Sequence, residues 1–215
     1  MEENEMSKII ETNEQLVNTV ASVAAEHGYK DVKAEFVAFS DFKVKWQRTF
    51  EWITFQVSDF MKDAPEEVIT NIFEVIFSKM RGDDVDYNEE AIAYMTGDGF
   101  VERNQRTWFE RHRAGAKVEF ELWDELKAEG LILSDERPAV RVGDVYYTSM
   151  LLRAMIVPEK VILDRELMMA AFIIMDGVLC TKFPDKPKAP EDRLEKALGE
   201  KWEEIVETLE NLRRW

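Results

Sequence analysis

The chain of 215 residues is 46% hydrophobic and 11% aromatic, which is enough apolar surface for one domain with a substantial core. Its 44 acidic and 28 basic residues give a formal net charge of -16. This charge argues against nucleic-acid and anionic-membrane partners, because both require a positive protein surface. The single cysteine, Cys180, excludes an internal disulfide.

The start of the chain does not resemble a secretion signal. Residues 1–5 are acidic where a signal peptide carries basic residues, and no apolar segment follows them. The longest apolar run, 167–175, is far shorter than the roughly 20 residues that a bilayer-spanning helix needs. We therefore expect a cytoplasmic protein without a membrane-embedded segment.

The first part of the chain changes from helical to strand periodicity. Apolar residues at helical spacing over 6–24 predict a helix that ends at His27-Gly28. Three segments of alternating polarity follow, over 32–36, 42–46 and 53–57. They predict an antiparallel meander with one buried face.

The middle of the chain is predicted to be mainly helical. The sequence Asp63-Ala64-Pro65-Glu66 indicates a helix start, and the apolar stripe after it ends near Gly82. Further helical patterns cover 88–95, 99–112 and 117–129.

Strand patterns return before the most apolar segment of the chain. The runs 139–142 and 145–148 flank Gly143-Asp144 and predict a hairpin, and 151–156 supplies a further strand. The segment 164–182 is hydrophobic almost all round, which predicts a buried helix.

The C-terminal part begins with a connector over 183–190, where three prolines at intervals of three favour extended backbone. Two acidic helices are expected over 191–198 and 200–213. One apolar stripe, which we expect to pack on the same chain, consists of Trp202, Ile205, Val206, Leu209 and Leu212. No internal repeat is evident.

These patterns together predict an α+β fold in a single domain, 1–215. Its parts are an N-terminal helix over 1–28, a core over 29–182, the connector over 183–190 and C-terminal helices over 191–215.

The sequence gives little support for a metal site or a catalytic nucleophile. The two histidines, His27 and His112, are far apart in sequence, and neither has a second histidine at helical spacing. We interpret His27 as a helix-terminal residue and His112 as a surface residue, and expect no metal and no cofactor. Cys180 ends an apolar helix, where an inert buried thiol is the usual case.

Asp176 is the remaining candidate for chemistry, because it lies in the apolar segment directly after Ile173, Ile174 and Met175. A carboxyl group in such a place could act as a general base. The alternative, which we favour, is that Asp176 lies near the helix end and either points to solvent or caps another group.

Several segments resemble one known family. Residues 42–68 contain Trp46-Gln-Arg-Thr and Asp63-Ala-Pro-Glu-Glu, and the segments 96–105 and 157–164 continue the likeness. Together they resemble prokaryotic zincin-type metallopeptidases related to the YgjP/SprT-like group. The resemblance implies a zincin-like framework, a short antiparallel or mixed sheet packed with several helices.

Carried over to this chain, the resemblance implies a degenerate site. The two histidines of the family's metal-binding helix would fall on Met175 and Leu179, its catalytic glutamate on Asp176, and its third ligand near Glu191. Met and Leu cannot replace imidazole as zinc ligands, and without zinc there is no activated water. The former metal cavity would then be ordinary core.

The sequence thus favours a non-catalytic, zincin-like scaffold or binding protein with an unknown protein or small-molecule partner. One alternative is a metal-independent hydrolase that uses the carboxylates of Asp176 and Glu191. A second is a structural homodimer assembled through the acidic C-terminal helices, although we favour a monomer because so acidic a surface repels a second copy.

Overall fold

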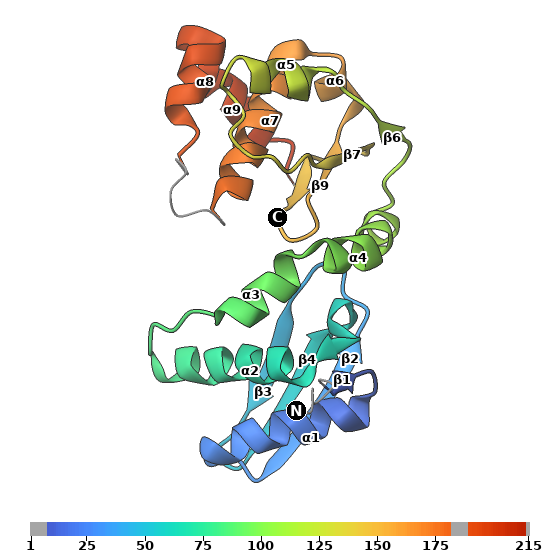
Figure 1. Ribbon diagram of the computed structural model, residues 1–215, viewed down its shortest axis with the longest axis vertical. Helices are drawn as coiled ribbons and strands as arrows, with labels where there is room; N and C mark the ends of the chain where they lie inside the picture. Colours follow the sequence, from blue (N-terminus) through green and yellow to red (C-terminus); the bar gives the residue numbers. More distant parts are fainter. Residues whose placement is uncertain (1–7, 182–188, 214–215) are drawn as a thin grey trace, which may run out of the picture. The chain divides into compact units, whose positions relative to one another are not determined.

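The computed structural model describes residues 8–181 and 189–213, which form two compact units, 1–100 and 101–215 (Figure 1). Both units combine helices with small sheets, so the α+β class is confirmed. The sequence analysis expects one domain, divided near residues 28, 182 and 190. The boundary between the units falls within a helix, α4 (Asp98–Arg111), where composition shows no linker.

The first helix, α1 (Asn13–Glu26), begins later than its apolar pattern indicates. Thr12 and Gln15 form a capping box that starts the helix, because each side chain binds a backbone N–H of the other. Ile9 and Ile10 form β1 (Ile9–Ile10), which pairs with β5 (Ala64–Pro65). The helix ends at His27 as expected.

The sheet of the first unit contains β2 (Asp31–Val37), β3 (Val44–Arg48) and β4 (Trp52–Ser58) in the order β2-β4-β3. The predicted antiparallel meander is wrong, because β2 pairs in parallel with β4 while β3 is antiparallel to it. The burial of the strands explains this order. Strand β4 occupies the centre of the sheet because its residues Ile53, Phe55 and Val57 are buried. Strand β3 is mostly exposed and lies at an edge of the sheet.

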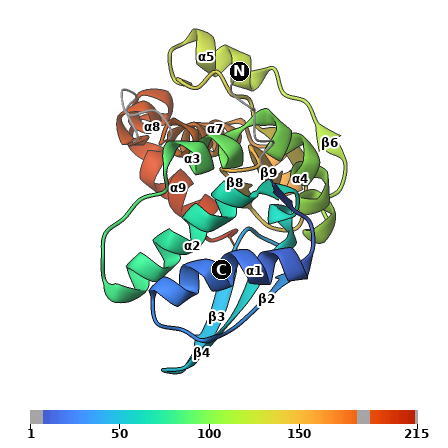
Figure 2. The same cartoon turned by 60° about the horizontal axis from the view of Figure 1, so that its bottom comes forward.

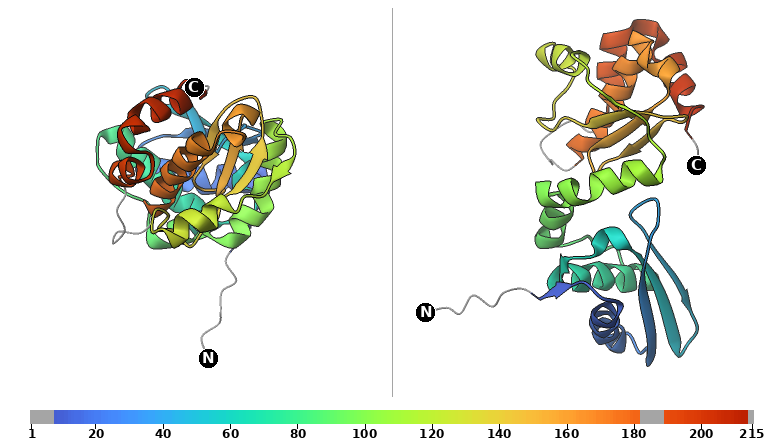
Figure 3. Two further views of the ribbon diagram at one scale, coloured as in Figure 1. Left: turned by 90° about the horizontal axis from the view of Figure 1, so that it is seen from above. Right: turned by 90° about the vertical axis from the view of Figure 1, so that its right-hand side faces the viewer.

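One face of this sheet is covered by α1 and α2 (Glu66–Arg81) (Figure 3). Phe55 of β4 packs edge to face against Phe73 and Phe77 of α2, with ring centroids 4.8 and 5.6 Å apart. The predicted end of α2 is confirmed, since Gly82 adopts the left-handed conformation at φ +91°. The 3-10 turn Asp59–Met61 leads into this helix, and α3 (Glu89–Thr96) and α4 follow it.

The sheet of the second unit has the order β6-β7-β9-β8. Its strands are β6 (Lys117–Val118), β7 (Ala139–Val142), β8 (Tyr147–Ser149) and β9 (Ala154–Val157). The predicted hairpin of 139–142 with 145–148 is wrong, because β9 is buried along its whole length and lies between β7 and β8. The predicted helix over 117–129 shortens to α5 (Leu122–Ala128), since Val118 pairs with Val140.

The apolar segment forms α7 (Arg165–Cys180), preceded by α6 (Glu159–Ile162). After it come α8 (Glu191–Leu198), a 3-10 turn (Gly199–Lys201) and α9 (Trp202–Glu210), and both α8 and α9 pack on α7. The C-terminal stripe is confirmed within this unit: Ile205 and Leu209 are buried in the core, and Trp202, Val206 and Leu212 pack against it. The predicted connector falls mostly on residues 182–188, which lie outside the described residues.

The two units share a topology, although no repeat is evident in the sequence. In each, three strands in a row form a sheet whose last strand is central, parallel to the first and antiparallel to the second. A 16-residue helix, α2 or α7, comes after the third strand. The sequences Pro65-Glu-Glu-Val-Ile69, at the start of α2, and Pro158-Glu-Lys-Val-Ile162, which contains α6, are also alike. Within the described ranges, no helix is both long and apolar enough to cross a membrane.

Candidate functional site

The positions that the resemblance assigns to metal-binding histidines lie on α7. Asp164 caps this helix by accepting hydrogen bonds from the backbone N–H groups of Glu166 and Leu167, at 3.0 and 3.1 Å. Met175 and Leu179 have no exposed surface and belong to the apolar cluster of the second unit. The predicted burial of Phe172 and Ile173 on the same helix is confirmed.

Asp176 lies on α7 between these residues and is also fully buried, at 0% exposure. The backbone N–H of Ser134 donates to its Oδ1 at 2.7 Å, and that of Leu133 donates to both carboxylate oxygens at 3.1 Å. The expected exposure of Asp176 to solvent is therefore wrong. Its carboxylate caps backbone groups, but those of a segment more than 40 residues earlier in the chain.

Arg193 of α8 completes this buried group. Its Nη1 donates to Oδ2 of Asp176 and, at 3.0 Å, to the carbonyl oxygen of Leu131. Its Nε and Nη2 atoms have no hydrogen-bond partner within the described part of the chain. The Cys180 thiol, buried as expected, lies 3.7 Å from Oδ2 of Asp176. The group thus ties α7, the 131–134 segment and α8 together, and it leaves a substrate no access to the carboxylate.

Glu191 does not join this arrangement. It lies in the first turn of α8 and is exposed, while Asp176 is closed off from solvent. The two carboxylates that the hydrolase alternative requires are therefore not brought together in one accessible site.

The two histidines have separate structural surroundings. His27 ends α1, stacks on Phe77 with ring centroids 4.7 Å apart and contacts Arg81. Burial and the Arg81 charge lower the pKa of His27. His112 is half-buried rather than on the surface, since its ring packs on Trp108 at 4.4 Å and its Nδ1 lies 2.9 Å from the Trp108 carbonyl oxygen.

Among the described residues, no group of three or more His, Cys, Asp or Glu side chains is arranged to hold a metal ion.

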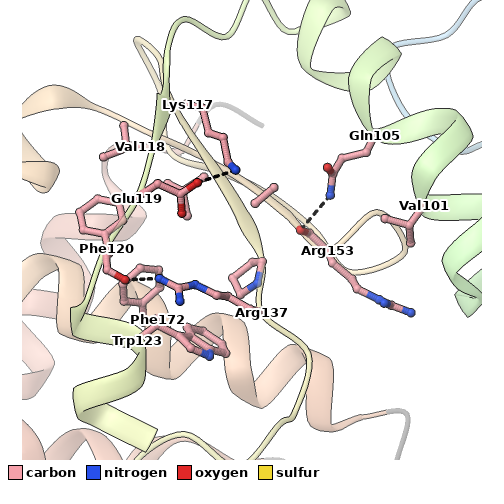
Figure 4. A pocket seen from close by; sticks show the side chains of 13 residues that line it. Val101, Gln105, Lys117, Val118, Glu119, Phe120, Trp123, Arg137, Arg153 and Phe172 are labelled. Atoms are coloured by element: carbon pink, nitrogen blue, oxygen red, sulfur yellow. Dashed lines mark hydrogen bonds and ion pairs between the residues drawn. The ribbon is translucent and has the colours of Figure 1, made fainter.

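The second unit has an open pocket of about 290 Å³ (Figure 4). It is bounded by α4, the β6 strand and the residues after it, α5, the start of β7 and α7. The lining residues are Val101, Gln105, Lys117, Val118, Glu119, Phe120, Trp123, Arg137, Pro138, Ala139, Val140, Arg153 and Phe172.

Aromatic rings form one wall of this pocket. Phe172 of α7 meets Phe120 and Trp123 edge to face, with ring centroids 5.4 and 5.3 Å away. Phe172 and Trp123 are almost fully buried, so their position is fixed by the core. The aromatic wall is therefore continuous with the apolar cluster of the second unit.

Three cations line the same pocket, each paired with a carboxylate. Lys117 lies 2.5 Å from Glu119, Arg137 lies 2.8 Å from Asp124, and Arg153 lies 3.1 Å from Glu136. The Arg137 guanidinium also donates to the Phe120 carbonyl oxygen, and in Figure 4 its side chain extends toward that residue. These contacts hold the cationic groups in place before any ligand binds.

The amide of Gln105 supports the other side of the pocket. Its Nε2 donates to the carbonyl oxygens of Leu152 at 2.8 Å and Arg153 at 3.4 Å, and thereby links α4 to the segment before β9. Figure 4 shows the bond to Arg153. The sequence analysis missed this pocket because it assigned residues 117–129 to one helix. The available signal was the alternation of Lys117, Val118, Glu119 and Phe120, which has the period of a strand.

Comparisons with protein-family models, with curated proteins and with solved structures find no match to this chain.

Proposed function

We propose that the protein is a non-catalytic binding protein with a degenerate zincin-like framework, and that the pocket of its second unit holds a small anionic ligand with a planar apolar part. The proposal depends on one observation: the Asp176 carboxylate is buried and inaccessible to a substrate, whereas the pocket is open to solvent. The acid best placed in the sequence for catalysis is used to hold α7 and α8 together.

The zincin-like framework rests on the placement of α7. This helix follows a mixed sheet and the Pro158 lead-in, and its interior positions Met175 and Leu179 are apolar where the family has histidines. Such side chains stabilise the core by about 1.5–3 kcal/mol each when buried, which favours a structural use of the former site.

The ligand class follows from the lining of the pocket. Lys117, Arg137 and Arg153 place three cationic donors on the lining, and an anionic group of a ligand would bind them in competition with their partners Glu119, Asp124 and Glu136. An apolar wall with a few positioned polar groups is the usual composition of a small-molecule site. A volume of about 290 Å³ suits a ligand smaller than a typical drug.

The other elements of the proposal concern assembly and location. The apolar stripe of the C-terminal helices is covered by the same unit, which favours a monomer over a dimer built through α9. A cytoplasmic location agrees with the single, buried cysteine, which needs no oxidising compartment.

A titration with phenyl phosphate, followed by ligand-observed NMR, tests the pocket. Phenol and benzylamine are the neutral and cationic controls. Arg137→Gln should weaken phenyl phosphate binding several-fold, while Lys127→Gln should leave it unchanged. The two variants are matched, because Arg137 and Lys127 are each 42% exposed and each forms one ion pair. Equal binding of phenol and phenyl phosphate, or equal effects of the two variants, would contradict the assignment.

A further inference from the structure

The β3 strand of the first unit has an open edge. It pairs with β4 on one side, and among the described strands no other lies beside it. The position of β3 next to β4 can be followed in Figure 2. An edge strand of this kind presents backbone donors and acceptors that another extended chain can use.

The hydrogen bonds at the two ends of the hairpin show which groups face outward. Ser58 donates its N–H to the Lys43 carbonyl oxygen at 3.0 Å, and Thr49 donates to the Trp52 carbonyl oxygen at 2.9 Å. Bonded and non-bonded pairs alternate along an antiparallel ladder. The odd-numbered residues of β3 therefore bond to β4, and the N–H and C=O groups of Val44, Trp46 and Arg48 point to the open edge.

Exposed aromatic side chains cluster on the same hairpin. Trp46 is 46% exposed, Trp52 is 38% exposed, and Phe50 at the turn is completely exposed at 101%. Tryptophan and arginine are the residues that most often dominate the binding energy of protein interfaces. A hairpin with this composition is better suited to a partner than to solvent.

The charge of this segment is opposite to that of the whole chain. Residues 42–50 contain Lys43, Lys45 and Arg48 and no acidic residue, whereas the chain carries a net charge of -16. Lys43 and Lys45 lie 4.9 and 5.2 Å from the centre of the Phe39 ring, and Arg48 donates to the Tyr29 hydroxyl at 2.9 Å. These contacts orient the cations through neutral groups and leave their charge for a partner's carboxylates.

We propose that the open edge of β3 binds an extended acidic segment of a partner protein by strand addition. Backbone bonds to Val44, Trp46 and Arg48 would give affinity, and the flanking cations would select acidic side chains. A second copy of this chain is a poor occupant, because pairing two β3 edges would oppose like charges. A nucleic acid is disfavoured by the net charge of -16 and makes no use of the backbone edge.

The test uses the full chain and a fluorescent peptide of alternating glutamate and valine, with a peptide of alternating lysine and valine as control. Fluorescence anisotropy should show binding of the acidic peptide alone. Lys45→Glu should weaken it by roughly tenfold or more. Lys62→Glu is the matched control, since Lys62 is also exposed and lies over a phenylalanine ring, that of Phe36, away from β3.

Amide hydrogen exchange followed by NMR separates strand addition from simple charge attraction. Peptide binding should slow exchange at Val44, Trp46 and Arg48 and change Lys45 and Gln47 little, because those amides already bond to β4. Binding without this alternating protection would overturn the proposal, as would equal losses in Lys45→Glu and Lys62→Glu. Tighter binding of oligothymidylate, or self-association abolished by Lys45→Glu, would assign the edge to a nucleic acid or to a second copy instead.

Discussion

Asp176 organises three segments of the second unit through one carboxylate. Its oxygens accept from the backbone of Leu133 and Ser134 and from Arg193, so helix α7, the 131–134 segment and helix α8 depend on the same group. A buried ion pair adds little net stability compared with apolar residues, but the loss of one partner leaves an uncompensated charge.

Asp176→Asn is therefore expected to destabilise the protein by about 3–5 kcal/mol, because Arg193 would remain buried without its counter-charge. The carboxylate lies in a buried network of hydrogen bonds, so its replacement by a neutral amide is costly. Urea unfolding measures the change. Asp192→Asn, at an exposed neighbour of Arg193 on α8, is the control and should change stability by less than about 0.5 kcal/mol.

A paired substitution tests whether an unpaired buried charge, rather than the lost hydrogen bonds, causes the destabilisation. Asp176→Leu together with Arg193→Met should recover much of the loss, because apolar residues remove both buried charges at once. A double variant as unstable as the sum of its single variants would show that the backbone bonds to Leu133 and Ser134, rather than the ion pair, account for the cost.

Titration of His27 should make the stability of the first unit depend on pH. Burial and the Arg81 charge lower its pKa from the ordinary value of 6.5, while Glu26 and Glu74 oppose the shift. The unfolded chain then binds a proton more readily than the folded chain. The stabilising contribution is complete above the unfolded pKa and is lost as the pH falls below about 6.5.

His27→Gln removes this titration. Between about pH 7.5 and pH 5.5, the melting temperature of the natural chain should therefore fall more than that of the variant. The carboxylates titrate in both proteins and cancel in the comparison. A variant that loses as much stability as the natural chain, or more, would mean that His27 does not have the lowered pKa.

At the scale of elements, local patterns predicted which segments are helices and strands better than they predicted which strands are neighbours. The stripe of α2 and its Gly82 end were predicted, because period and cap lie within one segment. The order β2-β4-β3 was not, since it depends on the relative burial of strands. The partners of Asp176 were also missed, because Leu133 and Arg193 are related to it only through the fold.

Gly143 illustrates this limit. Its place between two strand patterns predicts a hairpin turn, yet its N–H donates to the Val157 carbonyl oxygen of β9 at 3.1 Å. A Cβ atom at this position would lie 2.3 Å from Cγ2 of Ile156, so the glycine is required by the close approach of β9.

Gly143→Ala is expected to destabilise the protein by about 1–3 kcal/mol, because Ile156 is buried and cannot move aside freely. Combined with Ile156→Ala, the two changes should cost less than the sum of the single variants, as measured by urea unfolding. Gly99→Ala is the control, since no atom lies within 4 Å of its added Cβ. Strict additivity of the two changes would argue against the contact.

At the scale of the whole molecule, the two units have the same order and direction of three consecutive strands. In each, the most buried strand comes last and takes the centre of the sheet, and a 16-residue helix follows it. In the described part of the chain, the apolar cluster around α7 is formed by residues of the second unit. The exposed β3 edge and the lined pocket are thus features of separate units.

Because this apolar cluster lies within the second unit, we expect that unit to unfold cooperatively by itself. Scanning calorimetry of the full chain is expected to show two transitions, and Asp176→Asn should lower one of them and leave the other in place. Phe73→Ala, which removes a buried ring of the first unit, should lower the other transition. The stability losses of the two variants should add in the double variant, as they do for independent sites. A single transition that both variants lower would instead mean that the units unfold together, and that a ligand in the pocket also stabilises the β3 edge.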